Sequence, residues 1–175
     1  MLTQSVFTKS LFVACIISAP MIASALPSDA NQPIRLLADR ATYSARTGVT
    51  TYSGNVTIEQ GTLKIAADNL TVNLDTNNRR IRSAVATGRP ATMQQVVTQE
   101  KGLARGQANR IDYNAVTGIV TLTGNARLTQ AGSSFSGNTI RYSLSEGDVE
   151  ANAGAGQRVE LVFPPSGSGS RSGLR

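Results

Sequence analysis

The feature that most constrains this chain is an internal repeat at an offset of 70 residues. Residues 38–60 align with residues 108–130 without a gap, and the register of apolar positions continues to Leu74 and Leu144. The identical pairs include Arg40/Arg110, Tyr43/Tyr113, Thr47-Gly48/Thr117-Gly118, Gly54-Asn55/Gly124-Asn125 and Gln60/Gln130. Such a repeat predicts one small structural unit that is stacked more than once, each copy covering apolar surface of the next.

Apolar and polar residues alternate through most of both copies, as in Leu63, Ile65 and Ala67. A period of two predicts strands with one dry and one wet face, which is typical of antiparallel sheets. Turn residues between the segments favour a sandwich, a barrel or a stacked-sheet roll. At roughly 8–10 residues for each strand and turn, we expect about 13–16 strands. The Gly-Asn pairs inside two of these strands predict bends or bulges that let the sheet curl.

The chain begins with a segment that is distinct from the repeats. Residues 11–23 are apolar, follow Lys9 and end at Ala23-Ser24-Ala25. This pattern predicts a cleavable export signal over residues 1–25, with a lipid anchor on Cys15 as the alternative. The remaining chain divides into a flexible lead-in (26–32), one β-domain (33–163) and a disordered Gly/Ser tail (164–175).

Composition excludes several kinds of chemistry. The chain has no His and no Trp, and its one Cys lies in the predicted signal. Nucleophile systems built on Cys or His, and metal sites built on those ligands, are therefore absent from the β-domain. The carboxylates show no spacing typical of a catalytic pair, so we predict no enzyme, no metal and no cofactor. Those considered are Asp39, Asp68, Asp112 and Glu100.

The net charge of +6 raises the question of an anionic partner. Nucleic acid is not expected, because basic residues are not interleaved with aromatic ones and no nucleic-acid module is recognisable. The densest basic run is interpreted as a solvated turn, with lipid-headgroup phosphates as the alternative partner. It comprises Arg79, Arg80 and Arg82, followed by Arg89.

An ordered set of motifs resembles the OstA-like family of lipopolysaccharide export proteins. The set is an A-D-x-x-x-Y segment, a glycine turn, a G-N-V-x-apolar-x-Q-G strand and a second apolar strand ending in A-D, all within residues 38–68. A Q-P-I-R-L segment precedes it at 32–36, G-R-P-A-T-M follows at 88–93, and Y…L-T-G-N-A returns at 113–126. The resemblance covers about residues 29–165.

This resemblance implies a twisted antiparallel β-jellyroll, open at both ends, whose apolar interior takes the acyl chains of lipopolysaccharide. It also implies a periplasmic protein that associates head to tail and bridges an inner-membrane partner, LptC, and an outer-membrane partner, LptD. The second copy departs from the pattern at Asn109 and Asn138, where Asp is expected.

The resemblance and the alternation together select candidate lipid-contacting positions. Met93 is expected beside the middle turn, and Tyr113 with its ring inward and its hydroxyl near the rim. The candidates for the interior groove are Ile34, Leu36, Val56, Ile58, Met93, Tyr113, Leu122, Leu128 and Tyr142. From the residues alone, without the resemblance, an ordinary sandwich core is the favoured interpretation of the alternating apolar positions.

The two ends of the domain are candidate sheet edges, where unpaired backbone groups can join another copy. The candidate edge-strand contacts are Ile34 and Leu36 at one end and Val159, Leu161 and Phe163 at the other. A monomer with covered ends is the alternative. Two other function classes also remain open: a structural or adhesive β-repeat protein that binds only other proteins, and a carbohydrate-active enzyme with a carboxylate cleft.

Overall fold

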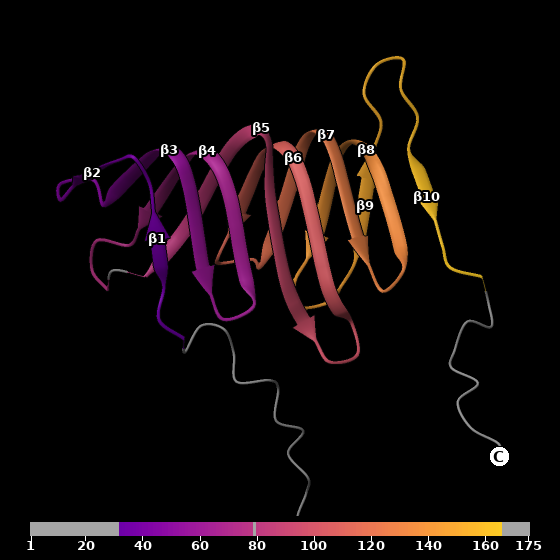
Figure 1. The fold of residues 1–175 in the computed structure, drawn as a ribbon, viewed down its shortest axis with the longest axis horizontal. Helices are drawn as coiled ribbons and strands as arrows, with labels where there is room; N and C mark the ends of the chain where they lie inside the picture. The colour runs from indigo at the N-terminus through magenta and orange to yellow at the C-terminus, as the bar shows by residue number, and fades with distance from the viewer. Residues whose placement is uncertain (1–31, 79, 166–175) are drawn as a thin grey trace, which may run out of the picture.

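The computed structural model describes residues 32–78 and 80–165, which form ten β-strands in a single antiparallel sheet (Figure 1). The strands are β1 (Arg35–Leu37), β2 (Arg40–Ser44), β3 (Val49–Gln60), β4 (Leu63–Leu74), β5 (Ile81–Thr98), β6 (Gly102–Asn114), β7 (Ile119–Gln130), β8 (Ser133–Ser143), β9 (Val149–Asn152) and β10 (Glu160–Val162). The all-β antiparallel prediction is confirmed. In this part of the chain, no helix is long and apolar enough to cross a membrane. The predicted signal peptide, most of the lead-in and residues 166–175 lie outside the described residues.

The expected number of strands was wrong, because the long strands do not stop where the sheet bends. Strands β3 to β8 each run for 11–18 residues and cross the bend through shifts in register. In β3 the shift lies between Ser53 and Val56, and in β7 between Thr123 and Ala126. Each predicted bulge therefore lies within one continuous strand. One long strand with a bulge takes the place of two of the shorter strands in the expected number.

The Gly-Asn pairs form these bends, as predicted. Gly54 and Asn55 have φ values of +78° and +46°, and Gly124 and Asn125 have +80° and +49°. Glycine is required at Gly54 for a second reason, since an added Cβ would collide with the carboxylate of Asp39. That carboxylate accepts a hydrogen bond from Asn55 Nδ2 at 3.1 Å, so it braces the bulge.

The bend folds the sheet into two facing layers (Figure 1). The front layer consists of β1, β10 and the segments 56–60, 63–67, 91–98, 102–108, 126–130 and 133–137. The rear layer consists of β2, β9 and the segments 49–53, 69–74, 81–87, 110–114, 119–123 and 139–143. We call the line of bends the crease and the opposite side, where hairpin turns end both layers, the mouth. Small side chains at the crease let the layers meet, as in the Ala91–Ala108 pair.

The duplication is visible in the strand order. Strand β6 in the centre corresponds, at the offset of 70, to β1 and β2 together. Strand β5, which pairs with β4, corresponds by its place in the sheet to β9 and β10, which pair with β8. A single long strand in the middle of the molecule thus corresponds to two short strands at each end. The front layer consequently ends at β1 on one side and at β10 on the other.

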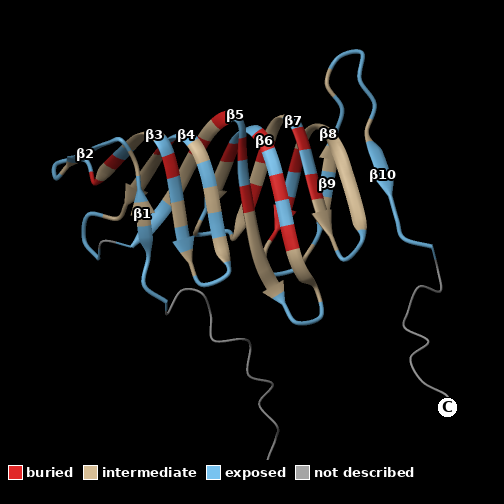
Figure 2. Ribbon diagram, in the orientation of Figure 1, coloured by how far each residue is buried: buried red, intermediate tan, exposed pale blue. Residues whose placement is uncertain are grey.

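Buried residues lie between the two layers and concentrate in the central strands (Figure 2). The largest fully buried side chains are Tyr142, Leu70, Leu122, Leu128, Ile140 and Val56. All of them come from the apolar positions of the alternating pattern, while the intervening polar residues face outward. Large apolar side chains with substantial exposure occur mainly at the two ends of the sheet.

Candidate functional site

One row of inward-facing residues crosses every strand of the front layer. Each member pairs directly with the next across the sheet, from one edge strand to the other. The row is Leu36, Ile58, Ile65, Met93, Gly106, Leu128, Phe135 and Leu161. We call it the front row. Residues of one face that pair in this way form a continuous apolar strip along the molecule.

Two rows of the rear layer face it. The first contains Tyr52, Leu70, Ala86, Ile111, Leu122, Ile140 and Ala151. The second, nearer the mouth, contains Thr50, Val72, Ala84, Tyr113, Val120, Tyr142 and Val149. The two layers therefore enclose a long apolar interior that is built from both copies of the repeat.

The structure brings eight of the nine candidate groove residues to this interior. Leu36, Ile58, Met93 and Leu128 lie in the front row, while Leu122, Tyr113 and Tyr142 lie in the rear rows and Val56 lies beside the crease. Ile34 is the exception, since it precedes β1 and is 54% exposed. Met93 lies within β5, because the strand resumes directly after the bend at Gly88–Pro90 and no separate turn forms there.

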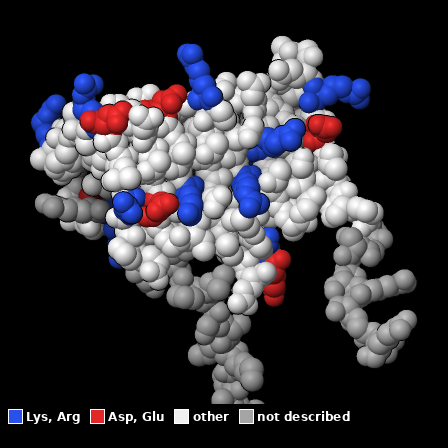
Figure 3. All heavy atoms as spheres, viewed as in Figure 1, with Lys and Arg blue, Asp and Glu red and all other residues white. Residues whose placement is uncertain are grey.

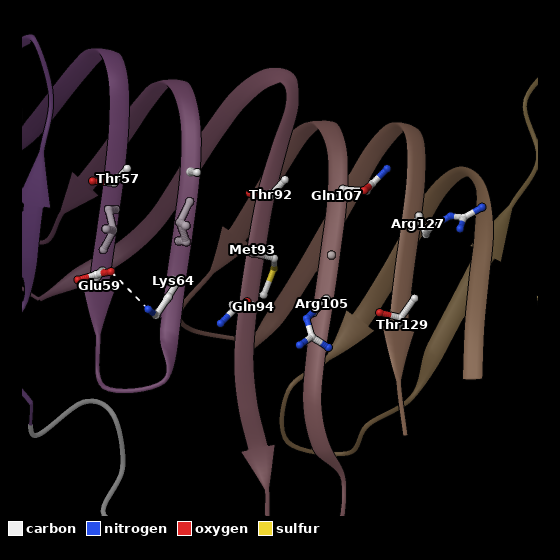
Figure 4. Close-up of a pocket in the computed structure, with 14 residues that line it drawn as sticks. Thr57, Glu59, Lys64, Thr92, Met93, Gln94, Arg105, Gln107, Arg127 and Thr129 are labelled. Carbon is white, nitrogen blue, oxygen red and sulfur yellow. Dashed lines mark ion pairs between the residues drawn. The ribbon is translucent and has the colours of Figure 1, made fainter. Parts of the chain in front are cut away.

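The layers touch at the centre of the molecule. A Cβ on Gly106 of the front row would approach Met93 Cγ to 3.1 Å and Leu122 Cδ1, from the opposite layer, to 3.2 Å. Two hollows of about 400 Å³ each are lined mostly by residues that point away from the interior. The front one is drawn in Figure 4. Neither hollow lies between the layers, so a guest in the interior has to part them.

A hydrogen bond joins the two layers near the mouth. The hydroxyl of Tyr142, from the rear layer, donates to Oε1 of Gln130, from the front layer, at 3.1 Å. Burial of the phenol raises the pKa of Tyr142, and Gln130 Nε2 is also buried and has no partner in the structure. We call this contact the cross-layer bond. Sequence reasoning missed it because the alternating pattern assigns each residue to a face and does not show which residue of the other layer it meets.

The corresponding positions of the first copy form no such bond. Val72 stands in place of Tyr142 and has no hydroxyl, and Gln60 Nε2 donates instead to the backbone oxygen of Gln32 at 3.1 Å. Ile58, Ile65 and Val72 are only partly buried. The interior of the first copy is thus the more accessible of the two.

The two ends of the front layer carry the exposed apolar residues. Leu37 is 53% exposed at β1, and Leu161 and Val162 are 49% and 51% exposed at β10. Phe163 follows β10 and packs edge-on against Phe135, with ring centroids 6.0 Å apart. Val159 lies just before β10 and is partly buried. Both ends combine unpaired strand edges with apolar side chains.

The charged groups of the structure are dispersed over its surface. Asp112 accepts hydrogen bonds from Arg110 Nε at 2.8 Å and Nη2 at 2.6 Å, and the bond to Asp112 holds the pKa of Arg110 above its ordinary value. Arg80, Arg82 and Arg89 are exposed, and Arg79 lies outside the described residues. Within the described ranges, no three His, Cys, Asp or Glu side chains gather where a metal ion could bind.

Comparison with known proteins assigns this chain to a protein family. A family described as "LptA/(LptD N-terminal domain) LPS transport protein" matches residues 35–148. The chain belongs to this family. The resemblance seen in the sequence motifs is thereby confirmed.

Individual relatives align along nearly the whole chain. The lipopolysaccharide export system protein LptA of Haemophilus influenzae is 33% identical over 92% of this chain and 94% of its own. The protein of the same name from Escherichia coli K12 is 31% identical over 91% of this chain and 88% of its own. The crystal structure of LptH from Pseudomonas aeruginosa, titled the LptA homologous periplasmic component of a lipopolysaccharide transport device, superimposes with a TM-score of 0.71 at 29% identity. That match covers 79% of this chain and all of the other.

Proposed function

We propose that this protein binds lipopolysaccharide in the periplasm and carries it between the two membranes by shielding its acyl chains. The observation that carries the proposal is the front row, an apolar strip that runs from one open sheet edge to the other. Family membership supports the identity of the guest. Each Å² of acyl surface removed from water contributes about 25 cal/mol, so burial of several hundred Å² supplies on the order of 10 kcal/mol towards parting the two layers.

The mechanism that we propose is passive and involves no reaction. Acyl chains enter at the mouth and lie between the front row and the rear rows, while sugars and phosphates stay outside in water. Directional drive comes from a partner, since the chain carries no phosphate-binding loop of the GxxxxGK[ST] type. Because the interior runs from edge to edge, the guest can continue into a neighbour whose strip joins this one.

We further propose that copies associate head to tail through β10 of one and β1 of the next. Unpaired backbone groups on two unlike edges pair without closing a ring, which extends the sheet and the strip together. The exposed Leu37 and Val162 fit an interface of this kind. The same edges are proposed to receive LptC and LptD at the two ends of the bridge.

Photo-crosslinking in cells tests the lipid proposal. A photoreactive residue at Leu36 or Tyr113 should give lipopolysaccharide adducts, whereas the same residue at the outward-facing Asp112 of the rear layer should not. Absence of adducts at both inward positions in folded protein would refute the interior as the lipid site. Normal arrival of lipopolysaccharide at the cell surface after depletion would instead support a protein-binding β-repeat role.

Sedimentation over a concentration series tests the association. Leu37→Lys and Val162→Lys should each shift the protein towards monomer, because either edge alone can block a heterologous contact. Val116→Lys is the matched control, since Val116 is 81% exposed but lies in a turn away from both edges. Equal behaviour of all three variants would contradict the edge-to-edge arrangement.

A further inference from the structure

The outward face of the front layer carries a hollow lined mostly by outward-facing residues, together with Ile58, Ile65, Met93 and Gly106 of the front row. Its volume is about 400 Å³, within the range of about 300–1,000 Å³ that small-molecule sites occupy. Its floor is a row of short side chains, Thr57, Ala66 and Thr92, which pair across β3, β4 and β5. The next row towards the mouth is polar and has mostly long side chains, and it comprises Glu59, Lys64, Gln94, Arg105 and Thr129. We call this site the outer hollow.

The charges of the outer hollow favour an anion. Lys64, Arg105 and Arg127 line it together with one carboxylate, that of Glu59, which lies 3.5 Å from Lys64. Neither Arg105 nor Arg127 makes an ion pair within the described ranges. In Figure 4 the Lys64 and Arg105 side chains flank Gln94, and Arg127 extends from the next strand towards β8. Figure 3 shows basic side chains spaced in a row across the middle of this face, with an acidic side chain among them.

The repeat explains why Arg105 has no carboxylate partner. Its counterpart in the first copy is Arg35, which pairs across the sheet with Glu59. At the position that corresponds to Glu59 the second copy has Thr129, which pairs with Arg105. The replacement of Glu by Thr leaves a guanidinium beside neutral hydrogen-bonding groups, which is a suitable environment for a phosphate oxygen.

The outer hollow lies near the mouth, on the outward face of the front layer. Lys64 follows the first residue of β4 and Thr129 precedes the last residue of β7, so this row lies just outside the rim of the front layer. A headgroup whose acyl chains enter at the mouth has to pass over this rim. Lys64 and Thr129 lie a single residue, about 3 Å, from the strand end, whereas Gln94 and Arg105 lie three or four residues, about 10–14 Å, from the ends of the longer β5–β6 hairpin.

We propose that the outer hollow binds a phosphorylated sugar of the lipid headgroup while the acyl chains lie in the interior. This proposal rests on the proposed function and adds the recognition of the charged end of the same guest. Lys64 and Arg105 bind the phosphate, Thr92 and Gln94 donate to or accept from sugar hydroxyls, and Arg127 neutralises a second acidic group. Affinity for the headgroup then depends on ionic strength, whereas burial of the acyl chains does not.

A probe without acyl chains tests the hollow separately from the interior. A phosphorylated glucosamine disaccharide is titrated into the full chain and followed by NMR through the backbone amides of Gln94, Arg105 and Gly106. These amides should shift, and the unphosphorylated disaccharide should leave them unchanged. Equal shifts with both sugars would overturn the proposal. Equal affinity for inorganic phosphate alone would overturn the sugar part and assign the hollow to free phosphate.

Variants of matched charge complete the test. Arg105→Gln with Arg127→Gln should weaken binding of the phosphorylated sugar by roughly three- to tenfold, the range expected for exposed charge-assisted contacts. Thr129→Glu should weaken binding similarly, because the new carboxylate lies beside Arg105 as Glu59 lies beside Arg35 in the first copy.

The control is Arg46→Gln with Arg158→Gln, which removes the same charge elsewhere and should leave binding unchanged. Equal losses in both double variants would show a nonspecific charge effect and overturn the site. Acyl-chain crosslinking at Leu36 should persist in all of them, which separates failure of the hollow from failure of the interior.

Discussion

The N-terminal half of the molecule (β1–β5) and the C-terminal half (β6–β10) share one strand pattern but differ in how completely their interiors are filled. Leu122, Leu128 and Tyr142 are at most 1% exposed, whereas their counterparts Tyr52, Ile58 and Val72 are only partly buried. The cross-layer bond between Tyr142 and Gln130 occurs in the C-terminal half alone. The same backbone thus buries these three positions completely in the second copy and leaves them partly accessible in the first, although Val56 and Leu70 of the first copy are also fully buried.

This difference indicates which half of the interior an acyl chain can enter more easily. In the C-terminal half, a guest would have to break a buried hydrogen bond and displace well-packed side chains. In the N-terminal half, it covers apolar surface that is already partly exposed to water. We therefore expect acyl chains to enter first beside β3 and β4.

The largest expected effect is a difference in stability between matched core truncations. Leu128→Ala should lower the free energy of unfolding by about 3–4 kcal/mol, because it removes a fully buried side chain. Ile58→Ala at the corresponding position should cost only about 1–2 kcal/mol, since Ile58 is partly exposed. Urea denaturation of both variants provides the measurement, and equal costs would contradict the asymmetry.

The second effect is on lipid capture. Val72→Tyr introduces into the N-terminal half a phenol equivalent to that of Tyr142. Its potential partner is Gln60, which occupies the position that corresponds to Gln130. It should weaken binding of a lipid A amphiphile by about tenfold, equivalent to about 1.4 kcal/mol. Val72→Phe is the control for ring size, and it should weaken binding less because it cannot form the hydrogen bond. Unchanged affinity in the tyrosine variant would show that this half is not where the lipid enters.

The third effect is on the cross-layer bond itself. Tyr142→Phe should lower the free energy of unfolding by about 1 kcal/mol, the usual contribution of one hydrogen bond, and it leaves the Gln130 amide without a partner. Faster amide hydrogen exchange should appear in the hairpin between β7 and β8 and not in that between β3 and β4. Equal exchange in both hairpins would argue against a bond that holds the layers together.

The smallest effect is on the pH dependence of stability. Burial raises the pKa of Tyr142, so above pH about 10 the unfolded chain loses a proton that the folded chain keeps. The stability that the wild type has over Tyr142→Phe is therefore fully present below pH about 10 and should shrink as the pH rises through the higher pKa of the folded protein. Chemical denaturation of the pair across this range measures it. A difference that stays constant with pH would contradict a buried phenol.

Much of the fold was predictable because local chemistry determines it. Alternation assigned the inward faces of β3, β4, β7 and β8, and the Gly54 and Gly124 bulges followed from the Gly-Asn pairs. The number of strands was not predictable in the same way. A bulge and a turn use similar residues, and only tertiary packing decides that β3 continues through the bend.

The site was predictable in part for the same reason. A period of two identified Leu36, Ile58 and Leu128 as inward but could not show that they belong to one row, because strand register is a non-local property. Ile34 shares the parity of Leu36, yet it precedes the strand and stays exposed. The outer hollow combines residues of five strands, and their spacing in the sequence carries no pattern.

Methyl NMR with a spin-labelled guest tests the central claim most directly, because it requires no substitution. A lipid A amphiphile that carries a nitroxide on one acyl chain is added to protein labelled at Ile, Leu and Val methyl groups. The account predicts strong broadening of Ile58, Ile65 and Val72, weaker broadening of Leu122 and Ile140, and none at Val116 in its exposed turn. Broadening confined to Val116 and other outward methyls, with Ile58 and Val72 unaffected, would show that the acyl chains never enter between the layers.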